Sequence, residues 1–482
     1  MRNSFVATIW SILDRVWAQI VSFLIGIVLA RLLTPEDYGL VGLSMVFIAF
    51  SNVFIDAGFS NALIRKIERT DTDYSTAFYF NIVMGGVMYL ILFLAAPWIA
   101  DYFNDSQLIL VTRIVSLTIL FNSLYIVQNA ILTAGFKMRQ QAIINISAQI
   151  PSGLLAIFLA YNGTGVYALA VQTVLASFLR ALFYWIVAKW RPSLKFSKSS
   201  MKYLWGFGSK LIGANMLGTV FNEIYTVLIG KFVGKRDLGF YSNGRTLSVQ
   251  PENICNGVVQ KVAVPLLAQY QKSPIVLREK YRELTKLITC VMTLISGILI
   301  VCAHPLILLI WGEKWRGTIP VFQLLILANV VSYVSYLSLV LLQIVNHTEY
   351  TLKLEFVKKP VFIVIIFVAL KYGLYGLLWG QIVISLLATI VNVSAPKKYI
   401  SYSYKEQFRD VLSYIVAWII ASACTFLISR VYDINYVLDL LVRAFVMIII
   451  YLGILLLVKD TLFIKYVGVI NSFIQEKICR KN

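Results

Sequence analysis

The chain has little charge, little histidine and few cysteines. Charged residues make up 14% of its 482 residues and apolar types 59%, whereas a soluble domain normally carries about 25% charged residues. Two histidines, His304 and His347, leave almost no material for a histidine-based triad or a metal cluster. Five cysteines form no CxxC pair, and we expect single buried thiols. These shortages exclude a set of ordinary soluble domains and favour the lipid bilayer as solvent.

Long apolar runs make up most of the chain instead. About 20 apolar residues cross a bilayer as a helix, so these runs predict an all-α integral membrane protein with about fourteen transmembrane helices. Two of the spans are separated only by Tyr372 and Gly373, and that boundary is the weakest in the count. The predicted spans are residues 12–33, 38–64, 76–100, 108–134, 140–161, 165–188, 204–230, 241–268, 284–310, 319–345, 353–371, 374–395, 410–430 and 437–458.

The distribution of Lys and Arg orients these spans. Alternate loops face the same side of a membrane, and 27 of the 43 basic residues fall on the side of the two chain ends, against 10 on the other side. Because cytoplasmic loops carry the excess of Lys and Arg, both termini are predicted to be cytoplasmic. The net charge of +20 then follows from topology and from attraction to anionic membrane lipid. No nucleic-acid partner is needed to explain it.

The loops between the spans are too short to form domains. A membrane enzyme that polymerises or ligates glycans usually has a large outer loop with basic or histidine residues. The outer links here hold about a dozen residues or fewer. The sequence therefore favours a transporter over an enzyme.

Two similar stretches, ARLLTPEDYG at 30–39 and GKFVGKRDLG at 230–239, each join two spans on the outer side. Six spans separate the copies, so both halves run in the same direction, as in a parallel repeat about an axis along the membrane normal. The alternative is that two unrelated helical hairpins share the same turn residues. An offset of 200 pairs Arg31 with Lys231, Asp37 with Asp237 and Gly39 with Gly239.

The repeat predicts two six-helix lobes with a seam between them. The N-lobe takes residues 1–190 with spans one to six, and a cytoplasmic linker follows at 191–203. The C-lobe takes 204–396 with spans seven to twelve, and 397–482 hold spans thirteen and fourteen and a cytoplasmic tail. Transport sites usually lie in such a seam near the middle of the membrane, and alternating access arises when the lobes rock.

Several spans carry polar residues at intervals of three and four, which places them on one helical face. One interpretation is hydrogen bonding between helices. The other is a shared hydrated cavity, which five such faces together favour. The faces are Arg15, Gln19, Ser22 and Gly26; Thr118, Asn122, Tyr125 and Asn129; Gln141, Asn145, Gln149 and Ser152; Asn215, Gly218, Asn222 and Thr226; and Arg245, Ser248, Glu252 and Asn256.

Ionisable residues within the spans are few and mostly basic. Each costs at least about 2.5 kcal/mol at a helix centre in hydrocarbon, so each should face water or a partner. Because Arg matches phosphate oxygens in a bidentate fork, this bias suits an anionic substrate. Snorkelling to the membrane surface is the alternative for a basic residue. We expect substrate binding by Arg15, Arg113, Arg180, Lys210, Arg245 and Lys261, and charge balance or binding of a coupling ion, H⁺ or Na⁺, by Asp56, Glu223 and Glu252.

Two further stretches are expected at surfaces. WGEKW (311–315) lies at the outer end of a span, and its two Trp residues predict an interfacial aromatic belt. YSYKEQFRD (402–410) is a charged cytoplasmic segment that leads into span thirteen, and it favours a surface position over a role in a site.

Several stretches carry a family resemblance in order along the chain: LARLLTPEDYGLVGLSMVFIAFSNVFIDAGFSNALIRK, FNIVMGGVMYLILFLAAPWIADYF, GTGVYALAVQTVLASF, VGKRDLGFYSNGRTLSVQP and WGEKWRGTIPVFQLLIL. They resemble Wzx-type polysaccharide export flippases. These belong to the MOP (multidrug/oligosaccharidyl-lipid/polysaccharide) superfamily, with the MATE drug antiporters and the lipid II flippases. The likeness covers roughly residues 10–400, and the first stretch is the most specific.

The resemblance implies a V-shaped fold of two helical lobes. It implies transport of undecaprenyl-pyrophosphate-linked oligosaccharides from the inner to the outer leaflet of the bacterial cytoplasmic membrane, for O-antigen, capsule or exopolysaccharide assembly. A cationic cavity would receive the pyrophosphate, and no catalytic residue or cofactor is expected. The expected state is a monomer that works with a polymerase and glycosyltransferases. Asp37 and Gly39 match the family signature as a turn between helices.

A MATE-like drug or cation antiporter on the same fold is the alternative function. It predicts a cavity with an acidic excess and aromatic walls, and the charge count within the spans points the other way.

Overall fold

The computed structural model describes residues 21–66, 68–429, 434–460 and 462–464, and every regular element among them is helical. The chain divides into two compact units, residues 1–242 and 243–482. The first unit holds the helix Val21–Leu32, α2 (Pro35–Asp56), α3 (Phe59–Arg65), α4 (Asp71–Phe103), α5 (Gln107–Ala134), α6 (Met138–Tyr161), α7 (Val166–Ala188), α8 (Lys198–Phe232) and the first turns of α9 (Lys235–Val258).

The second unit begins within α9, at residue 243. Its α11 packs against α13, α17 and α18, and α13 packs against α15. The elements that follow α9 are η1 (Val259–Ala263), α10 (Val264–Ala268), α11 (Pro274–Val301), α12 (Ala303–Trp311), η2 (Glu313–Trp315), α13 (Thr318–Ile344), α14 (Thr348–Leu370), α15 (Gly373–Asn392), α16 (Ser394–Ile400), α17 (Tyr404–Ile428) and α18 (Tyr436–Leu457).

The helices have the length and surface of membrane spans. Eleven of them, among the described residues, are long and apolar enough to cross a bilayer. Large apolar side chains stand exposed on their outer faces, such as Leu94 and Trp98 of α4 and Leu441 and Phe445 of α18. Soluble proteins rarely expose apolar surface on this scale. The chain is therefore a multi-pass helical membrane protein.

The predicted spans correspond to helices, with differences at several points. The runs 353–371 and 374–395 are two separate helices, α14 and α15, joined at Gly373 with a φ of 65°. Many neutral polar residues keep α9 out of the eleven apolar helices, and charged residues keep α14 out. The first predicted span begins outside the described residues. The count of fourteen spans stays a prediction.

The second predicted span is broken between α2 and α3. Ala57 and Gly58 both adopt positive φ, at 45° and 71°. Asp56 accepts hydrogen bonds from the amide (3.1 Å) and the hydroxyl (2.6 Å) of Ser60, which satisfies a donor that the start of α3 would leave free. A methyl group at Gly208 of α8 would clash with the Ala57 carbonyl. The break therefore lets α8 pack closely and sets α3 beside it.

The two copies of the repeated turn contact each other. A methyl group at Gly39 would clash with the carbonyl oxygen of Lys235, and a methyl group at Gly239 would clash with the carbonyl oxygen of Pro35. At an offset of 200, position 35 is equivalent to 235 and 39 to 239. The contact is therefore reciprocal, as it is across a twofold axis.

Equivalent positions also pair with each other along this crossing of α2 and α9. Arg236 forms an ion pair with Glu36, with 3.5 Å between Nε and Oε1. A Cβ added at Gly42 would lie 3.0 Å from the hydroxyl of Ser242. The sequence predicted the repeated turns but not that they meet. The extension of the repeat to six helices per lobe stays a prediction.

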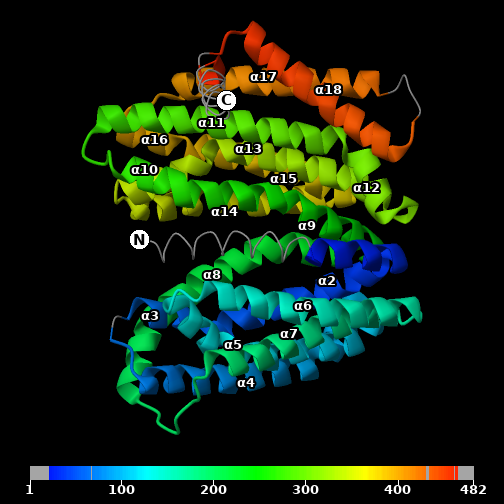
Figure 1. The fold of residues 1–482 in the computed structure, drawn as a ribbon, viewed down its shortest axis with the longest axis vertical. Coiled ribbons are helices and arrows are strands. Elements are labelled where there is room, and N and C mark those ends of the chain that lie inside the picture. The colour runs from blue at the N-terminus through cyan, green and yellow to red at the C-terminus, as the bar shows by residue number, and fades with distance from the viewer. Residues whose placement is uncertain (1–20, 67, 430–433, 461, 465–482) are drawn as a thin grey trace, which may run out of the picture. The chain divides into compact units, whose positions relative to one another are not determined.

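The compact units have other bounds than the predicted lobes, and the bounds of the lobes stay a prediction. The boundary lies between residues 242 and 243 rather than at the linker 191–203. The reason is that α8, which follows that linker, packs against α2, α3 and α4 of the first unit. Figure 1 shows α4, α5, α6 and α7 of this unit lying side by side.

The prediction of an aromatic belt at WGEKW is wrong. Trp311 ends α12, and Gly312 with a φ of 86° turns the chain into η2. This turn brings Trp315 back onto Trp311, with ring centroids 5.5 Å apart. Both rings are buried, and Trp315 has no exposed surface. Both rings are therefore packed inside the second unit instead of facing lipid.

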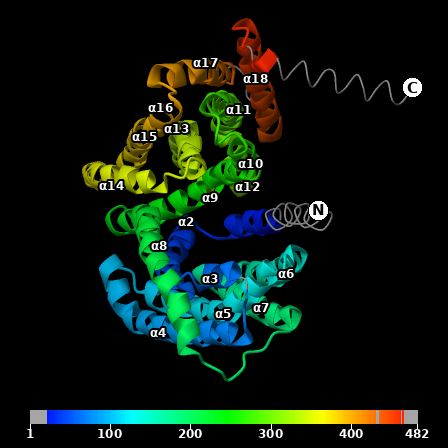
Figure 2. The ribbon, with the colours of Figure 1, turned by 90° about the vertical axis from the view of Figure 1, so that its left-hand side faces the viewer.

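The last two helices of the described chain lie against α11 (Figure 2). A methyl group at Gly297 of α11 would clash with the Met447 side chain of α18. The hydroxyls of Thr293 and Tyr451 lie 2.8 Å apart. A glycine contact and a buried hydrogen bond thus hold α18 to α11.

Candidate functional site

Neutral polar side chains of α5, α6 and α7 form one connected cluster, which we call the amide seam: Asn129, Thr133, Gln141 and Tyr184. The Gln141 amide donates to Asn129 Oδ1 and to Thr133 Oγ1, both at 2.8 Å. The Tyr184 hydroxyl donates to the same Asn129 oxygen at 3.0 Å. Members of two predicted polar faces therefore meet as hydrogen bonds between helices, which supports the packing interpretation for these members.

Arg180 lies on α7, one turn before Tyr184. It is half-buried, and its Nε has no hydrogen-bond partner among the described residues. Arg113 of α5 differs, because its Nε donates to the Phe93 carbonyl at 3.3 Å and its guanidinium lies 4.3 Å over the Phe93 ring. A partly buried cation with an unused donor is more costly without an anion than one with local partners. Arg180 is thus the stronger candidate of the two for contact with an anionic ligand.

The other predicted residues of the first unit have simpler surroundings. Lys210 is exposed on α8. Asp56 binds Ser60 at the start of α3 and so stabilises the helix break. Glu223 is half-buried and accepts a hydrogen bond from the Thr226 hydroxyl at 3.2 Å.

Three predicted residues belong to the second unit. Arg245 and Glu252 are half-buried on α9, and seven residues, or about two helical turns, separate them. Between them, the Ser248 carbonyl accepts a hydrogen bond from the Asn329 amide of α13 at 3.0 Å, which fixes this part of α9. Lys261 is exposed on the π-helical turn η1.

The predicted site residues are therefore divided between the compact units. Five lie in the first unit and three in the second, and Arg15 lies outside the described residues. Within the first unit, no ion pair among the described residues joins a predicted cation to a predicted carboxylate. A cationic cavity shared by both halves of the chain stays a prediction.

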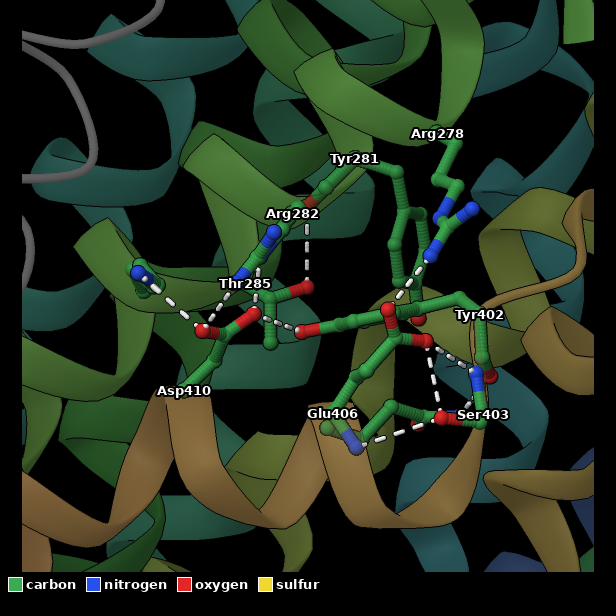
Figure 3. A network of polar contacts seen from close by, with 10 residues as sticks. Arg278, Tyr281, Arg282, Thr285, Tyr402, Ser403, Glu406 and Asp410 are labelled. Carbon is green, nitrogen blue, oxygen red and sulfur yellow. Dashed lines mark hydrogen bonds and ion pairs between the residues drawn. The ribbon is translucent and has the colours of Figure 1, made fainter. Parts of the chain in front are cut away.

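The sequence interpretation missed an ion-pair cluster of Arg282, Lys286, Tyr402 and Asp410 (Figure 3). The Asp410 carboxylate accepts from Arg282 Nε and, at 2.7 Å, from a terminal nitrogen of the same guanidinium. Tyr402 donates to it at 2.7 Å, and Lys286 lies 3.1 Å away. The Asp410 side chain is 3% exposed and Tyr402 is fully buried. The prediction that 402–410 is a surface segment is wrong for both residues.

A second ion pair lies at the rim of this cluster. Arg278 donates to Glu406 at 2.6 Å, and both side chains are about one-third exposed. Ser403 and Glu406 form a capping box at the start of α17. The spacing Ser-x-x-Glu could have indicated the cap, but the partners on α11 lie 128 residues away.

A family model described as polysaccharide biosynthesis protein matches residues 28–320, more than half of the chain. The chain belongs to this family. The chain is 24% identical over 325 residues to the teichuronic acid biosynthesis protein TuaB of Bacillus subtilis (strain 168), and this match covers 67% of each chain. It is 25% identical over 325 residues to the succinoglycan biosynthesis transport protein ExoT of Rhizobium meliloti (strain 1021), covering 66% of this chain and 65% of that protein.

Solved structures share the fold of this chain. The lipid II flippase MurJ in an inward closed conformation matches with a TM-score of 0.73 at 14% identity, covering 94% of this chain and 99% of that one. A multidrug resistance MATE family transporter of the MOP superfamily, in an inward-facing conformation, matches with a TM-score of 0.59 at 15% identity, covering 80% and 94%. These likenesses confirm the predicted all-helical membrane fold, which is like that of the lipid II flippase and MATE structures.

Proposed function

We propose that this protein is a flippase. It moves lipid-linked oligosaccharide, with undecaprenyl pyrophosphate as the carrier lipid, from the inner to the outer leaflet of the bacterial cytoplasmic membrane. The family match over residues 28–320 carries this proposal. A relative whose name describes transport in succinoglycan biosynthesis and a fold like that of a lipid II flippase support it. Both termini lie in the cytoplasm, and the protein is not an enzyme.

The charge of the helices fits a diphosphate cargo. Arg180 on α7 and Arg245 on α9 are half-buried cations, whereas Lys210 and Lys261 are exposed. Desolvated guanidinium groups bind phosphate oxygens in a bidentate fork. Of these residues, we propose Arg180 as the main contact of the first unit with the diphosphate, because its Nε has an unused donor.

The three carboxylates have unequal prospects as coupling groups. Asp56 caps α3, so its carboxylate already has a structural role. Glu252 is half-buried on α9, and we propose it over Asp56 as the group that balances charge or binds H⁺ or Na⁺ during the cycle. Glycosyltransferases that build the cargo and a polymerase that consumes it are the partners that this function requires.

Labelling of the outer membrane surface in spheroplasts of a deletion strain tests the function. Lipid-linked oligosaccharide should accumulate on the cytoplasmic face, where an impermeant glycan-modifying reagent cannot reach it. Expression of the intact chain should restore labelling from outside. Normal outer labelling in the deletion strain, with no second flippase present, would overturn the proposal. Energy-dependent efflux of cationic dyes by the purified chain in liposomes would favour the MATE-like alternative, which the fold likeness alone leaves open.

Substitution of Arg180 tests its role. Arg180→Gln should reduce export at least tenfold, because a charge-assisted hydrogen bond contributes about 1.5–3 kcal/mol. Arg180→Lys should retain part of the activity, since it keeps the charge and loses the fork. Lys195→Gln, at an exposed loop cation, is the matched control. Wild-type export by folded Arg180→Gln would remove Arg180 from the site and leave the family function intact.

A further inference from the structure

A pocket of about 460 Å³ opens in the first compact unit between α3 and α8, away from the amide seam. Its volume lies within the range of small-ligand sites, about 300–1,000 Å³. Two of its lining residues are cations and none is a carboxylate. The lining residues are Ala62, Arg65, Lys202, Tyr203, Gly206 and Phe207.

The backbone builds this pocket. The break at Ala57 and Gly58 turns α3 away from the line of α2. Gly208 allows α8 to touch the break, whereas a Cβ at Gly206 would meet no atom within 4 Å. One glycine therefore brings the two helices together and the other, two residues earlier, leaves open space between them. Figure 1 shows α3 and α8 in this part of the first unit.

The nearby acid is already engaged by other groups. Asp73 forms an ion pair with Lys66 at 2.7 Å and accepts hydrogen bonds from the amide and hydroxyl of Thr70. Among the described residues, no carboxylate pairs with Arg65 or Lys202. Two uncompensated positive charges therefore face the pocket.

The Arg65 guanidinium contacts an aromatic wall of the pocket. Its Cζ lies 5.0 Å from the centroid of the Phe207 ring, which is a cation–π contact. This contact does not use up the five N–H donors of the guanidinium. A guanidinium with available N–H groups can bind phosphate in a bidentate fork. Lys202 adds a second charge on the opposite helix, and Tyr203 and Ala62 supply apolar wall.

The ligand chemistry follows from these groups and from the predicted topology. Residues 65–75 and 189–203 belong to the side that carries most Lys and Arg, which is the cytoplasmic side. We propose that the pocket between α3 and α8 binds the phosphate headgroup of an inner-leaflet lipid, with Arg65 as the bidentate ligand and Lys202 as the second cation. If the lipid is the carrier of the cargo, the pocket is a docking site before transport, and that extension rests on the proposed function.

Equilibrium binding by the purified full chain tests this assignment. Native mass spectrometry would count lipid adducts in three arms: undecaprenyl diphosphate, phosphatidylglycerol and inorganic diphosphate. Arg65→Gln and Lys202→Gln should each weaken lipid binding about tenfold. Arg65→Lys should weaken it less. Arg69→Gln is the matched control, because Arg69 is a neighbouring cation that does not line the pocket and donates to the Lys66 carbonyl.

The outcomes separate the sources of the phosphate. If Arg65→Gln and Lys202→Gln weaken the binding of undecaprenyl diphosphate alone, or of both lipids, the result supports a lipid headgroup site. Binding of inorganic diphosphate alone, or an equal loss in Arg69→Gln, overturns it. Wild-type binding by both single variants also overturns it. Arg65 and Lys202 are exposed, so we expect both variants to fold. If only one of them folds, that variant alone is enough for the test. Because this readout is binding and not export, its failure would leave the proposed function untouched.

Discussion

The amide seam and the ion-pair cluster both join helices, but the first uses neutral polar groups and the second uses charged groups. The seam of the first unit uses neutral groups, in which one oxygen of Asn129 accepts from Gln141 and Tyr184. The cluster of the second unit uses charges, in which Asp410 accepts from Arg282, Lys286 and Tyr402. Both lie near helix ends for which the Lys and Arg distribution predicts the cytoplasmic side.

The difference shows how many hydrogen-bond or ion-pair partners a neutral amide and a buried carboxylate each require. A neutral amide within a membrane protein gains on average about 0.6 kcal/mol from a hydrogen bond between helices. A buried carboxylate without its partners costs several times more. Asp410 therefore has three partner residues for one carboxylate, and its cations extend toward solvent, with Arg282 37% exposed. The cluster also ties α17, a helix beyond the predicted lobes, to α11.

Asp410→Leu should produce the largest effect. It leaves Arg282 and Lys286 without their shared anion, and we expect a loss of about 3 kcal/mol in unfolding free energy, at the lower end for a broken buried pair because both cations reach water. Denaturant unfolding of the purified chain in detergent would measure it. A loss below 1 kcal/mol would show that the cluster behaves like a surface pair.

Arg282→Met added to Asp410→Leu should recover part of that loss, about 1–2 kcal/mol. The double variant removes one cation that the first substitution leaves without an anion. The measurement is a double-mutant cycle on the same unfolding assay. Additive losses would mean that Arg282 and Asp410 do not stabilise each other.

Asn129→Leu should cost about 1 kcal/mol, less than Asp410→Leu, because it removes a neutral acceptor from two donors. Thermal unfolding in detergent would report it, with Asn162→Leu as a control at an exposed amide that bonds only within its own helix end. If Asn129→Leu lowered the stability as much as Asp410→Leu does, the claim that the amide seam contributes less than the ion-pair cluster would be contradicted.

Glu406→Gln should have the smallest effect, at most about 0.5 kcal/mol. The Arg278–Glu406 pair is about one-third exposed at both ends, and exposed ion pairs contribute little. Gln also preserves the capping box with Ser403, so the substitution isolates the charge. The check is the unfolding midpoint at low and high salt, where a large salt-dependent shift would contradict the expectation.

Much of the fold follows from local sequence, since apolar runs specify helices and a link such as Tyr372-Gly373 ends one. The polar face with Asn129 was also readable, because its spacing is local. Contacts between residues far apart in the sequence could not be predicted. Arg282 and Asp410 are 128 positions apart, so no local pattern around either residue predicts the pair. The break at Gly58 was hidden because the run on both sides stays apolar. The Trp311 and Trp315 prediction failed because composition does not show which way a turn folds back.

The contact of α2 with α9 bears on how a repeat within one chain, as the sequence predicts it, differs from a dimer. In two identical subunits, a position that meets its own equivalent must face the same residue, so a charge there would meet a like charge. Two similar segments of one polypeptide are free of that restriction, because each position can hold its own residue. Positions 36 and 236 hold Glu and Arg and form an ion pair, while positions 39 and 239 both remain glycine because each faces a backbone carbonyl. Side chains at equivalent positions of one polypeptide can thus be complementary, whereas the backbone contact imposes the same small residue on both sides.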